Sequence, residues 1–410
     1  MAMQLTLTGV RDLYAQLGGL VIFRNLLDEA LLARFRTVLQ TIVQYKESPV
    51  PLAEALGAFE FSLLQKGEDW SAVLLDLILE DDNLWIRKAA AGGAGEVAQA
   101  CLVRELSLLQ QAGALTMPSL LSTLPNADHL TALLPAPWKV STLDYAAAYR
   151  QRCAQISRTG YGLFAHYRAF TLENGALVPV RCPDNQRLDQ MPGYERERRK
   201  VLENTQALLA GKPAANVLLY GDAGTGKSST VKAIANEYAG QGLRLIEVKK
   251  NQLYQLPALM DELAQNPLKF ILFIDDLSFA ANDDNFAALK AILEGSVGGR
   301  SQNVAVYATS NRRHLVKERM SDRTGDDLHE ADTRQELMSL SARFGLTVTF
   351  QRPDKALFDR IVQELARQYG VEMPADRLLV QAGAFALRAG GRSPRVAKQF
   401  VELVAAGVEG

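Results

Sequence analysis

Apolar residues recur at three- and four-residue spacing through the first part of the chain, which is the period of an amphipathic helix. Two long segments show it, LYAQLGGLVIFRNLLDEALLARFRTVLQTIVQYK and WSAVLLDLILEDDNLWIRKAA. Glycine, proline and polar residues near 47–51, 92–95 and 113–137 predict breaks between the helices. We predict an all-helical domain over residues 1–150, which serves either as a partner-binding or regulatory domain or as a plain helical bundle.

A different pattern follows in a predicted linker over residues 151–182. The segment AFTLENGALVPV has two β-prone runs on either side of Asn174 and Gly175, which predicts a small β-hairpin joining the helical region to the rest of the chain. The polar segment RCPDNQRLDQMPGY then leads into a helical segment, ERERRKVLENTQALLAG.

Short apolar runs and helical segments alternate over residues 183–351. This alternation predicts a parallel five-stranded sheet with helices on both faces, and therefore an α/β domain. After Pro353 the pattern is helical only, which predicts a lid over residues 352–410. The predicted strands are 216–220, 243–248, 270–274, 303–308 and 346–350, and the predicted helices of the α/β domain are 195–210, 227–240, 257–265 and 284–294.

The composition excludes several classes of protein but does not indicate a particular function. The chain has 410 residues, 48% hydrophobic and 22% charged, with a net charge of −1. It lacks the basic excess of a constitutive nucleic-acid binder. Its three cysteines lie far apart, which argues against zinc and disulfides and favours the cytoplasm. No signal-peptide layout and no apolar run of about 18 residues is present, so we expect no membrane span.

The strongest chemical signal is GDAGTGKS at residues 221–228, which matches G-x-x-x-x-G-K-[ST] at each fixed position. The glycines let successive backbone N–H groups turn toward phosphate oxygens. Lys227 would bring a cation to the β- and γ-phosphates, and the Ser228 hydroxyl would ligate Mg²⁺. An apolar run precedes the motif, and the helix after it favours an anion at its N-terminus. The predicted phosphate-binding residues are Gly221, Asp222, Ala223, Gly224, Thr225, Gly226, Lys227, Ser228 and Ser229.

Acidic residues end the apolar strand FILFIDD. At the carboxyl edge of a parallel sheet, where ligands bind, Asp275 would hold Mg²⁺ through its water shell. Asp276 would orient or deprotonate the attacking water. The alternative is that both aspartates cap the next helix.

Three further residues are candidates for contact with the nucleotide. Asn311 follows the strand VAVYATS, where it would contact the γ-phosphate or the water, unless it only serves a turn. Arg343 precedes the last strand and would neutralise charge during phosphoryl transfer. Arg395 starts a lid helix and would reach the phosphates from there. For both arginines the alternative is an ordinary place on the surface.

In this order and spacing, GDAGTGKS, FIDD, ATSN, ARFGL and GRSPR resemble Walker A, Walker B, sensor 1, the arginine finger and sensor 2 of an AAA+ ATPase. The resemblance covers residues 183–410. Longer strings, such as NVLLYGDAGTGKSSTVKA and YATSNRRHLV, are similar to a bacterial family known as domain of unknown function 815. The helical N-terminal region also resembles that family, with less specific strings.

The resemblance implies that the nucleotide is ATP or ADP with Mg²⁺. It implies that Asn311 is sensor 1, that Arg395 is sensor 2, and that Arg343 is a finger offered to a neighbouring subunit of a homo-oligomer. It also implies that the segment around Met191, Gly193 and Tyr194 lies against the adenine, where the alternative is a linker turn.

One departure from the AAA+ pattern changes the expected rate. Most such enzymes carry Asp-Glu where this chain has Asp275 and Asp276. The second aspartate is one methylene shorter and would hold water less well. We therefore predict slow hydrolysis, on the lower side of the ~1–100 s⁻¹ usual for phosphoryl transfer.

The resulting hypothesis is an ATPase that couples ATP to the assembly or remodelling of a protein or nucleic-acid partner. A nucleotide-gated adaptor or loader with negligible turnover is the alternative, and a small-molecule kinase is a remote one. Residues 312–335 are rich in both signs of charge, which predicts an exposed loop. Its basic start, including His314 and Lys317, would meet nucleic acid or a neighbouring subunit, or only solvent.

Overall fold

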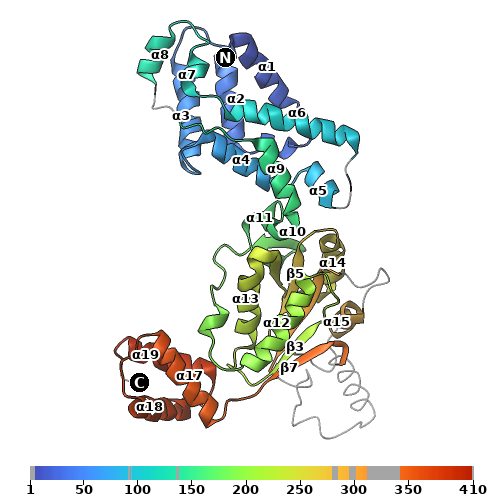
Figure 1. Cartoon of the computed structure of the whole chain (residues 1–410), viewed down its shortest axis with the longest axis vertical. Helices are drawn as coiled ribbons and strands as arrows, with labels where there is room; N and C mark the ends of the chain where they lie inside the picture. Colours follow the sequence, from blue (N-terminus) through green and yellow to red (C-terminus); the bar gives the residue numbers. More distant parts are fainter. Residues whose placement is uncertain are drawn as a thin grey trace. The chain divides into compact units, whose positions relative to one another are not determined.

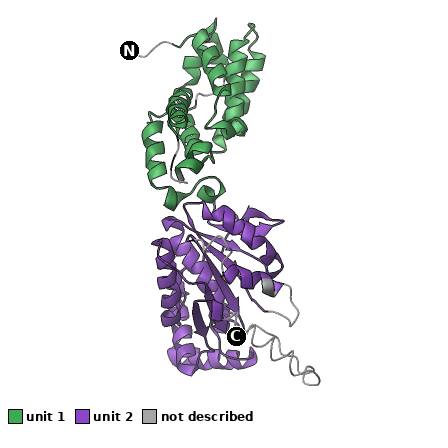
Figure 2. Cartoon of the chain, turned by 90° about the vertical axis from the view of Figure 1, so that its right-hand side faces the viewer, with its two compact units in different colours: residues 1–166 green, residues 167–410 purple. Residues whose placement is uncertain are grey.

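The computed structural model describes residues 5–90, 93, 95–134, 138–278, 285–294, 302–311 and 342–408. The chain divides into two compact units, residues 1–166 and 167–410 (Figure 2). Each unit has a hydrophobic core of its own.

The first unit is helical, as its apolar spacing predicts (Figure 1). Helix α2 buries Leu31, Phe35 and Ile42 on one face. The ring of Phe35 lies 4.7 Å from that of Trp70, whose indole N–H donates to a helix carbonyl at 3.0 Å. The helices are α1 (Leu7–Gly18), α2 (Ala30–Val43), α3 (Val50–Leu64), α4 (Trp70–Glu80), α5 (Leu84–Ala90), α6 (Glu96–Gly113), α7 (Met117–Leu121), α8 (Ala127–Leu133), α9 (Tyr145–Ala154), α10 (Ile156–Thr159) and α11 (Leu163–His166), with a 3₁₀ turn η1 (Arg24–Leu27).

Short helices depart from the sequence prediction in two places. Helices α7 and α8 lie in the predicted break at 113–137, where the Thr116 hydroxyl accepts from the Ser119 N–H and Pro118 lies in the first turn. Helices α9, α10 and α11 continue to residue 166, where a linker was expected from 151. The helical unit is therefore longer than residues 1–150.

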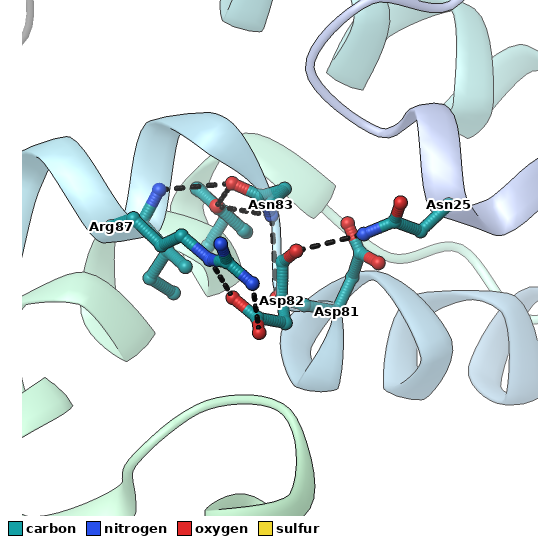
Figure 3. Close-up of polar contacts among 7 residues, drawn as sticks. Asn25, Asp81, Asp82, Asn83 and Arg87 are labelled. Atoms are coloured by element: carbon teal, nitrogen blue, oxygen red, sulfur yellow. Dashed lines mark hydrogen bonds and ion pairs between the residues drawn. The ribbon is translucent and has the colours of Figure 1, made fainter. Parts of the chain in front are cut away.

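The turn between α4 and α5 buries a carboxylate oxygen. Asp81 Oδ2 is buried and has no hydrogen-bond partner in the described part of the chain. The groups around it are already engaged: Asn25 donates to the Asp82 carbonyl at 2.8 Å, and Arg87 pairs with the Asp82 carboxylate at 2.6 Å (Figure 3). The pKa of Asp81 is raised to about 6, mainly by burial and to a lesser extent by the neighbouring Asp82 charge, while hydrogen bonds from Asn83 and Asn25 act in the opposite direction.

This environment predicts that stability depends on pH. A carboxyl whose pKa is higher in the folded than in the unfolded chain binds its proton more tightly when folded. The free energy of unfolding should therefore fall as pH rises from about 4 to about 6, and stay level above that range. Asp81→Asn should make this fall smaller and raise the free energy of unfolding at pH 7 by about 1–2 kcal/mol. Part of the fall should remain, because burial also raises the pKa of Glu60, Asp76 and Glu80.

Urea unfolding followed by tryptophan fluorescence measures this effect, because Trp70, Trp85 and Trp138 all lie in the first unit. The matched change Asp82→Asn at the next residue should leave most of the fall between pH 4 and 6 in place, because burial and not the Asp82 charge is the main cause of the raised pKa of Asp81. A pH profile that is the same in Asp81→Asn and the unmodified protein would refute the assignment.

The second unit is built on a seven-stranded sheet in the order β2-β1-β4-β5-β6-β3-β7. All neighbouring pairs are parallel except β1 and β2. The strands are β1 (Ala169–Glu173), β2 (Ala176–Pro179), β3 (Val217–Gly221), β4 (Leu243–Glu247), β5 (Lys269–Ile274), β6 (Val304–Ser310) and β7 (Leu346–Phe350). The five predicted strands correspond to β3 to β7, which confirms the predicted α/β class.

Strand β5 shows why this sheet is covered on both faces. Its residues 270–274 are all buried, although successive side chains point to opposite faces. Ile271 and Phe273 belong to the core cluster that contains Val231 and Ile234 of helix α13. The flanking elements are α12 (Glu195–Leu209), α13 (Lys227–Tyr238), η3 (Ala239–Gln241), η4 (Lys250–Gln255), α14 (Leu256–Ala264) and α15 (Asn285–Glu294).

The predicted hairpin is present, with Asn174 and Gly175 at φ of 50° and 83° in its turn. It does more than link two regions. Strand β1 pairs in parallel with β4, so the hairpin extends the sheet from five strands to seven.

Helices α17 (Lys355–Gln368), α18 (Ala375–Arg388) and α19 (Pro394–Ala405) form the C-terminal lid (Figure 1). Their apolar faces meet each other, for example where the rings of Phe385 and Phe400 lie 5.7 Å apart. Each described helix of the chain is too short or too polar to traverse a lipid bilayer.

Candidate nucleotide-binding site

A cavity of about 480 Å³ lies at the carboxyl ends of β3, β5 and β6, and helices α17 and α19 of the lid close one side. This is where parallel sheets bind ligands. Among the residues predicted for the site, the cavity is lined by Met191, Tyr194, Ala223, Gly224, Thr225, Gly226, Lys227, Ser228, Ser229, Asp275, Asp276, Asn311 and Arg395. The lining does not include Gly193, Gly221, Asp222 or Arg343.

The loop between β3 and α13 needs glycine at specific places. Gly221 has φ 139°, and a Cβ there would lie 2.0 Å from the Phe350 carbonyl oxygen of β7. Gly226 has φ 91° and caps α13, so the free N–H groups of the helix start face the cavity. The segment thus has the backbone form that the motif predicts for binding phosphate.

The ammonium of Lys227 belongs to a residue that is 6% exposed, and it makes three hydrogen bonds within the site. Nζ donates to the carbonyls of Gly221 and Asp222, each at 2.8 Å, and to Asn311 Oδ1 at 3.0 Å. Burial lowers the pKa of Lys227, whereas nearby carboxylates, such as that of Asp275, act in the opposite direction. Lys227 is therefore a largely desolvated cation that is held against the loop between β3 and α13.

Asp275 lies between the loop and the next strand. Its Oδ1 accepts from the Ser228 hydroxyl at 2.6 Å and from the Thr309 hydroxyl at 2.5 Å. The two predicted metal-binding residues, Ser228 and Asp275, are thus brought into contact. Thr309, at the end of β6, thus positions Asp275.

Asp276 and Asn311 are also brought together. The Asn311 amide donates to Asp276 Oδ1 at 2.8 Å, while its oxygen accepts from Lys227. Asp276 has φ 49°, a left-handed conformation supported by a hydrogen bond from its N–H to Thr309 Oγ1 at 2.9 Å. Through Thr309, these residues join Asp275 in one continuous polar network.

The lid contacts the phosphate loop through the main chain. The Arg395 N–H at the start of α19 donates to the Gly224 carbonyl at 3.1 Å. A second contact comes from the connection after β7, where the Arg352 N–H donates to Asp222 Oδ2 at 3.0 Å. The side chain of Arg395 is exposed and lines the cavity. Asp222 thus supports the loop from outside the cavity.

The opposite end of the cavity is more apolar. Tyr194 is buried, stacks on Phe350 with ring centres 5.4 Å apart, and donates its hydroxyl to the Gln351 carbonyl. Burial raises the pKa of Tyr194, so it stays neutral. Gly193 has φ 79°, and a Cβ there would lie 2.9 Å from Ile361 of α17. Gly193 therefore allows a close approach of the lid rather than lining the cavity.

Arg343 lies away from the cavity. In the parallel pair, Leu346 of β7 is opposite Val217, the first residue of β3. Arg343 precedes Leu346, so it is near the amino ends of the strands, whereas the phosphate loop follows their carboxyl ends. The predicted loop at 312–335, with His314 and Lys317, lies outside the described residues.

Sequence reasoning missed several residues of the cavity wall. One had a usable signal: Arg198 occurs on the same face of α12 as Val201, Thr205 and Leu208, which are buried. An arginine on an apolar stripe indicates a specific partner. The others gave no local signal, because distant segments bring them together: Gln186, Ile361, Leu365 and Lys398.

The parallel sheet, the phosphate loop before α13, the acidic end of β5 and the helical lid define a P-loop fold of the AAA+ class. A family model described as protein of unknown function (DUF815) matches residues 165–408. The chain belongs to this family, which confirms the resemblance found in the sequence.

Other comparisons add little. No curated protein matches the chain. Similar solved structures include the Thermotoga maritima RuvB Holliday junction branch migration motor, at 18% identity and a TM-score of 0.37, over 55% of this chain and 67% of that one. A variant of the same Thermotoga maritima protein, in which one arginine is replaced by alanine, has 18% identity and a TM-score of 0.35 over the same shares. Likenesses this loose carry no argument about activity.

Proposed function

We propose that the chain binds ATP with Mg²⁺ and hydrolyses it slowly, and that the nucleotide state drives the assembly or remodelling of a protein or nucleic-acid partner in the cytoplasm. The observation that carries the proposal is the convergence of Lys227, Ser228, Asp275, Asp276 and Asn311 on one cavity. These residues come from three strand ends, and a plain surface turn would not need them together.

Lys227 would exchange its present partners for phosphate. It donates to two loop carbonyls and to Asn311, and phosphate oxygens would replace these neutral acceptors with charged ones. The N–H groups at the start of α13 would bind the same oxygens. Arg395 would approach from the lid, which closes the cavity on the side away from the sheet.

The oxygens present suit magnesium. Ser228 Oγ and Asp275 Oδ1 lie 2.6 Å apart, and hydroxyl and carboxylate oxygens are the ligands that Mg²⁺ prefers. The described residues contain no cluster of three histidine, cysteine or acidic side chains that would hold a metal alone. When bound, Mg²⁺ would neutralise charge on the β- and γ-phosphates.

Asp276 would orient the attacking water or accept its proton. Asn311 holds Asp276 Oδ1 at 2.8 Å, which fixes the direction of a short carboxylate. Oδ2 is the oxygen left for water. Slow turnover follows, since an aspartate reaches less far than the glutamate usual in the resembling enzymes.

The same hydrogen bond favours a second candidate, a nucleotide-gated adaptor or loader with negligible turnover. If Asn311 keeps Asp276 from the water, ATP would act as a ligand that changes the lid without being consumed. Both candidate functions require ATP binding, and they differ in whether the bound ATP is hydrolysed.

Phosphate release at saturating ATP and Mg²⁺, with Lys227→Ala as the blank, separates them. Release above the blank supports the ATPase. Tight ATP binding without release supports the adaptor. No ATP or ADP binding would overturn both. Capture of partners from cell extract by Asp276→Asn, with ATP and without, then tests whether the ATP state selects a partner.

Thr309→Val tests the proposed metal site. Valine keeps the shape of this buried residue and removes the hydroxyl that holds Asp275. Losing an outer-shell partner of this kind typically weakens metal binding by about 10–100-fold. We expect the Mg²⁺ concentration for half-maximal ATP binding to rise by that order, measured by titration. Thr347→Val on an exposed position of β7 is the control, and an unchanged Mg²⁺ requirement in Thr309→Val would argue against the role.

A further inference from the structure

Arg198 is a buried cation at the apolar end of the cavity. It lies on α12, is 7% exposed, and lines the cavity together with Met191 and Tyr194. Burial lowers the pKa of Arg198, but a guanidinium remains charged at neutral pH. A buried charge of this kind needs a compensating partner.

The structure provides only part of that compensation. Arg198 Nη2 donates to the Met191 carbonyl, and the described residues supply no other hydrogen bond or ion pair to this guanidinium. The carboxylates of Glu195 and Glu197 stabilise the charge of Arg198 through space, without an ion pair. Glu195 is engaged with the Gly193 N–H at 2.9 Å and with Arg360 at 3.1 Å. Most of the five N–H donors of Arg198 are therefore unused.

These unused donors are directed at the cavity. The fully buried side-chain nitrogens and oxygens without a partner include an atom of Arg36 but none of Arg198. The remaining nitrogens of Arg198 thus reach open space, and the cavity is the space that this buried residue lines. An unpaired, buried guanidinium facing a cavity is suited to a ligand with hydrogen-bond acceptors.

The position of Arg198 along the cavity indicates which part of the nucleotide it would contact. Lys227 and Ser228 mark the phosphate end. Arg198 is bonded to Met191, and that end includes Pro192 and Tyr194 from the segment 186–194, with Ile361 from the lid. Apolar walls with few polar groups are what a nucleotide base needs. The ligand group at Arg198 is therefore the base.

Resting on the proposed binding of ATP, we propose that Arg198 and the Met191 carbonyl determine base specificity by reading the N7 and N6 edge of adenine. The guanidinium donates to N7, and the carbonyl, which has a second lone pair, accepts from the N6 amine. Guanine presents two acceptors at this edge, so its O6 would face the carbonyl oxygen of Met191.

Equilibrium binding to the full-length protein tests the assignment at single atoms. ATP, 7-deaza-ATP, GTP and inorganic triphosphate compete against a fluorescent ADP analogue. The unmodified protein should prefer ATP over both 7-deaza-ATP and GTP by about 5–100-fold, the range for a good base contact. In Arg198→Met, ATP affinity should fall by about as much and the preference over 7-deaza-ATP should be lost, whereas part of the preference over GTP should remain, because the Met191 carbonyl is still present. Inorganic triphosphate, which lacks a base, should bind both proteins equally.

Arg199→Met is the matched control, because this arginine is the next residue on α12 and is exposed. It should keep the preferences of the unmodified protein. If Arg198 only held the turn at Met191, the Arg198→Met protein would bind ATP, 7-deaza-ATP and GTP more weakly by the same factor. Unchanged ratios of the three affinities would therefore overturn the inference. Equal binding of the three by the unmodified protein also overturns it, even if Arg198→Met does not fold. No nucleotide binding at all would instead defeat the proposed function.

Discussion

Replacing Lys227 with alanine is expected to reduce ATP hydrolysis by about 10²–10³-fold, the loss typical of removing one charge-stabilising group from an active site. The alanine protein would also bind ATP more weakly, because Lys398, the other lysine of the described cavity wall, belongs to helix α19 of the lid and not to the phosphate loop. Phosphate release and equilibrium binding measure the two effects.

Lys232→Ala is the control for this change. Lys232 is on the same helix, α13, but pairs with Glu247 at 3.5 Å and is not part of the cavity wall. It should hydrolyse ATP at the rate of the unmodified protein. If Lys227→Ala keeps that rate as well, the phosphate site has been misplaced.

Removing Arg343 is expected to have an effect as large or larger. An arginine finger contributes about 10³–10⁵ in rate, so Arg343→Ala should lose that order of activity while still binding ATP. The reason it would act on a neighbouring subunit is geometric. Strand β3 spans about 13 Å from its start beside Leu346 to the phosphate loop, at about 3.3 Å per residue. This is longer than an arginine side chain, so a site cannot receive the Arg343 of its own chain.

Mixing two inactive proteins tests the action between subunits. Lys227→Ala lacks a working site but has the finger, and Arg343→Ala has the site but lacks the finger. A one-to-one mixture that exchanges subunits should recover roughly a quarter of the normal activity, since half of the sites are intact and half of those meet a finger. Full activity of Arg343→Ala alone, as a monomer in sedimentation, would exclude the model.

The sequence predicted the central sheet well because its strands carry strong local signals. Strand β5, for example, is a continuous apolar run ending in Asp275. The pairing of β1 with β4 had no such signal, because Asn174 and Gly175 specify a turn but not the sheet edge beside which it lies. Short helices such as α7 and α10 were not predicted for another reason. Four or five residues are too few to show the helical period of apolar positions.

The same distinction applies to the site. Lys227, Ser228 and Asp275 were found because each belongs to a short motif of fixed spacing. The contact between Lys227 and Asn311 spans 84 positions, and no local pattern reports it. The placement of Gly193 against Ile361 depends equally on a lid that begins far downstream.

The bond between the Arg395 N–H and the Gly224 carbonyl joins two main-chain groups. Exchanging the side chain at 395 for any other except proline removes neither atom. Gly224 is different: its φ is 77°, and a Cβ there would lie 3.1 Å from Ser393 Oγ and 3.2 Å from Arg395 Cβ. The hydrogen bond between loop and lid can thus persist when the side chain at 395 differs among relatives. Inserting or deleting a residue between Gly391 and Arg395 would shift the donor out of reach. This contact is therefore more sensitive to a gain or loss of residues before Arg395 than to a change of side chain at 395.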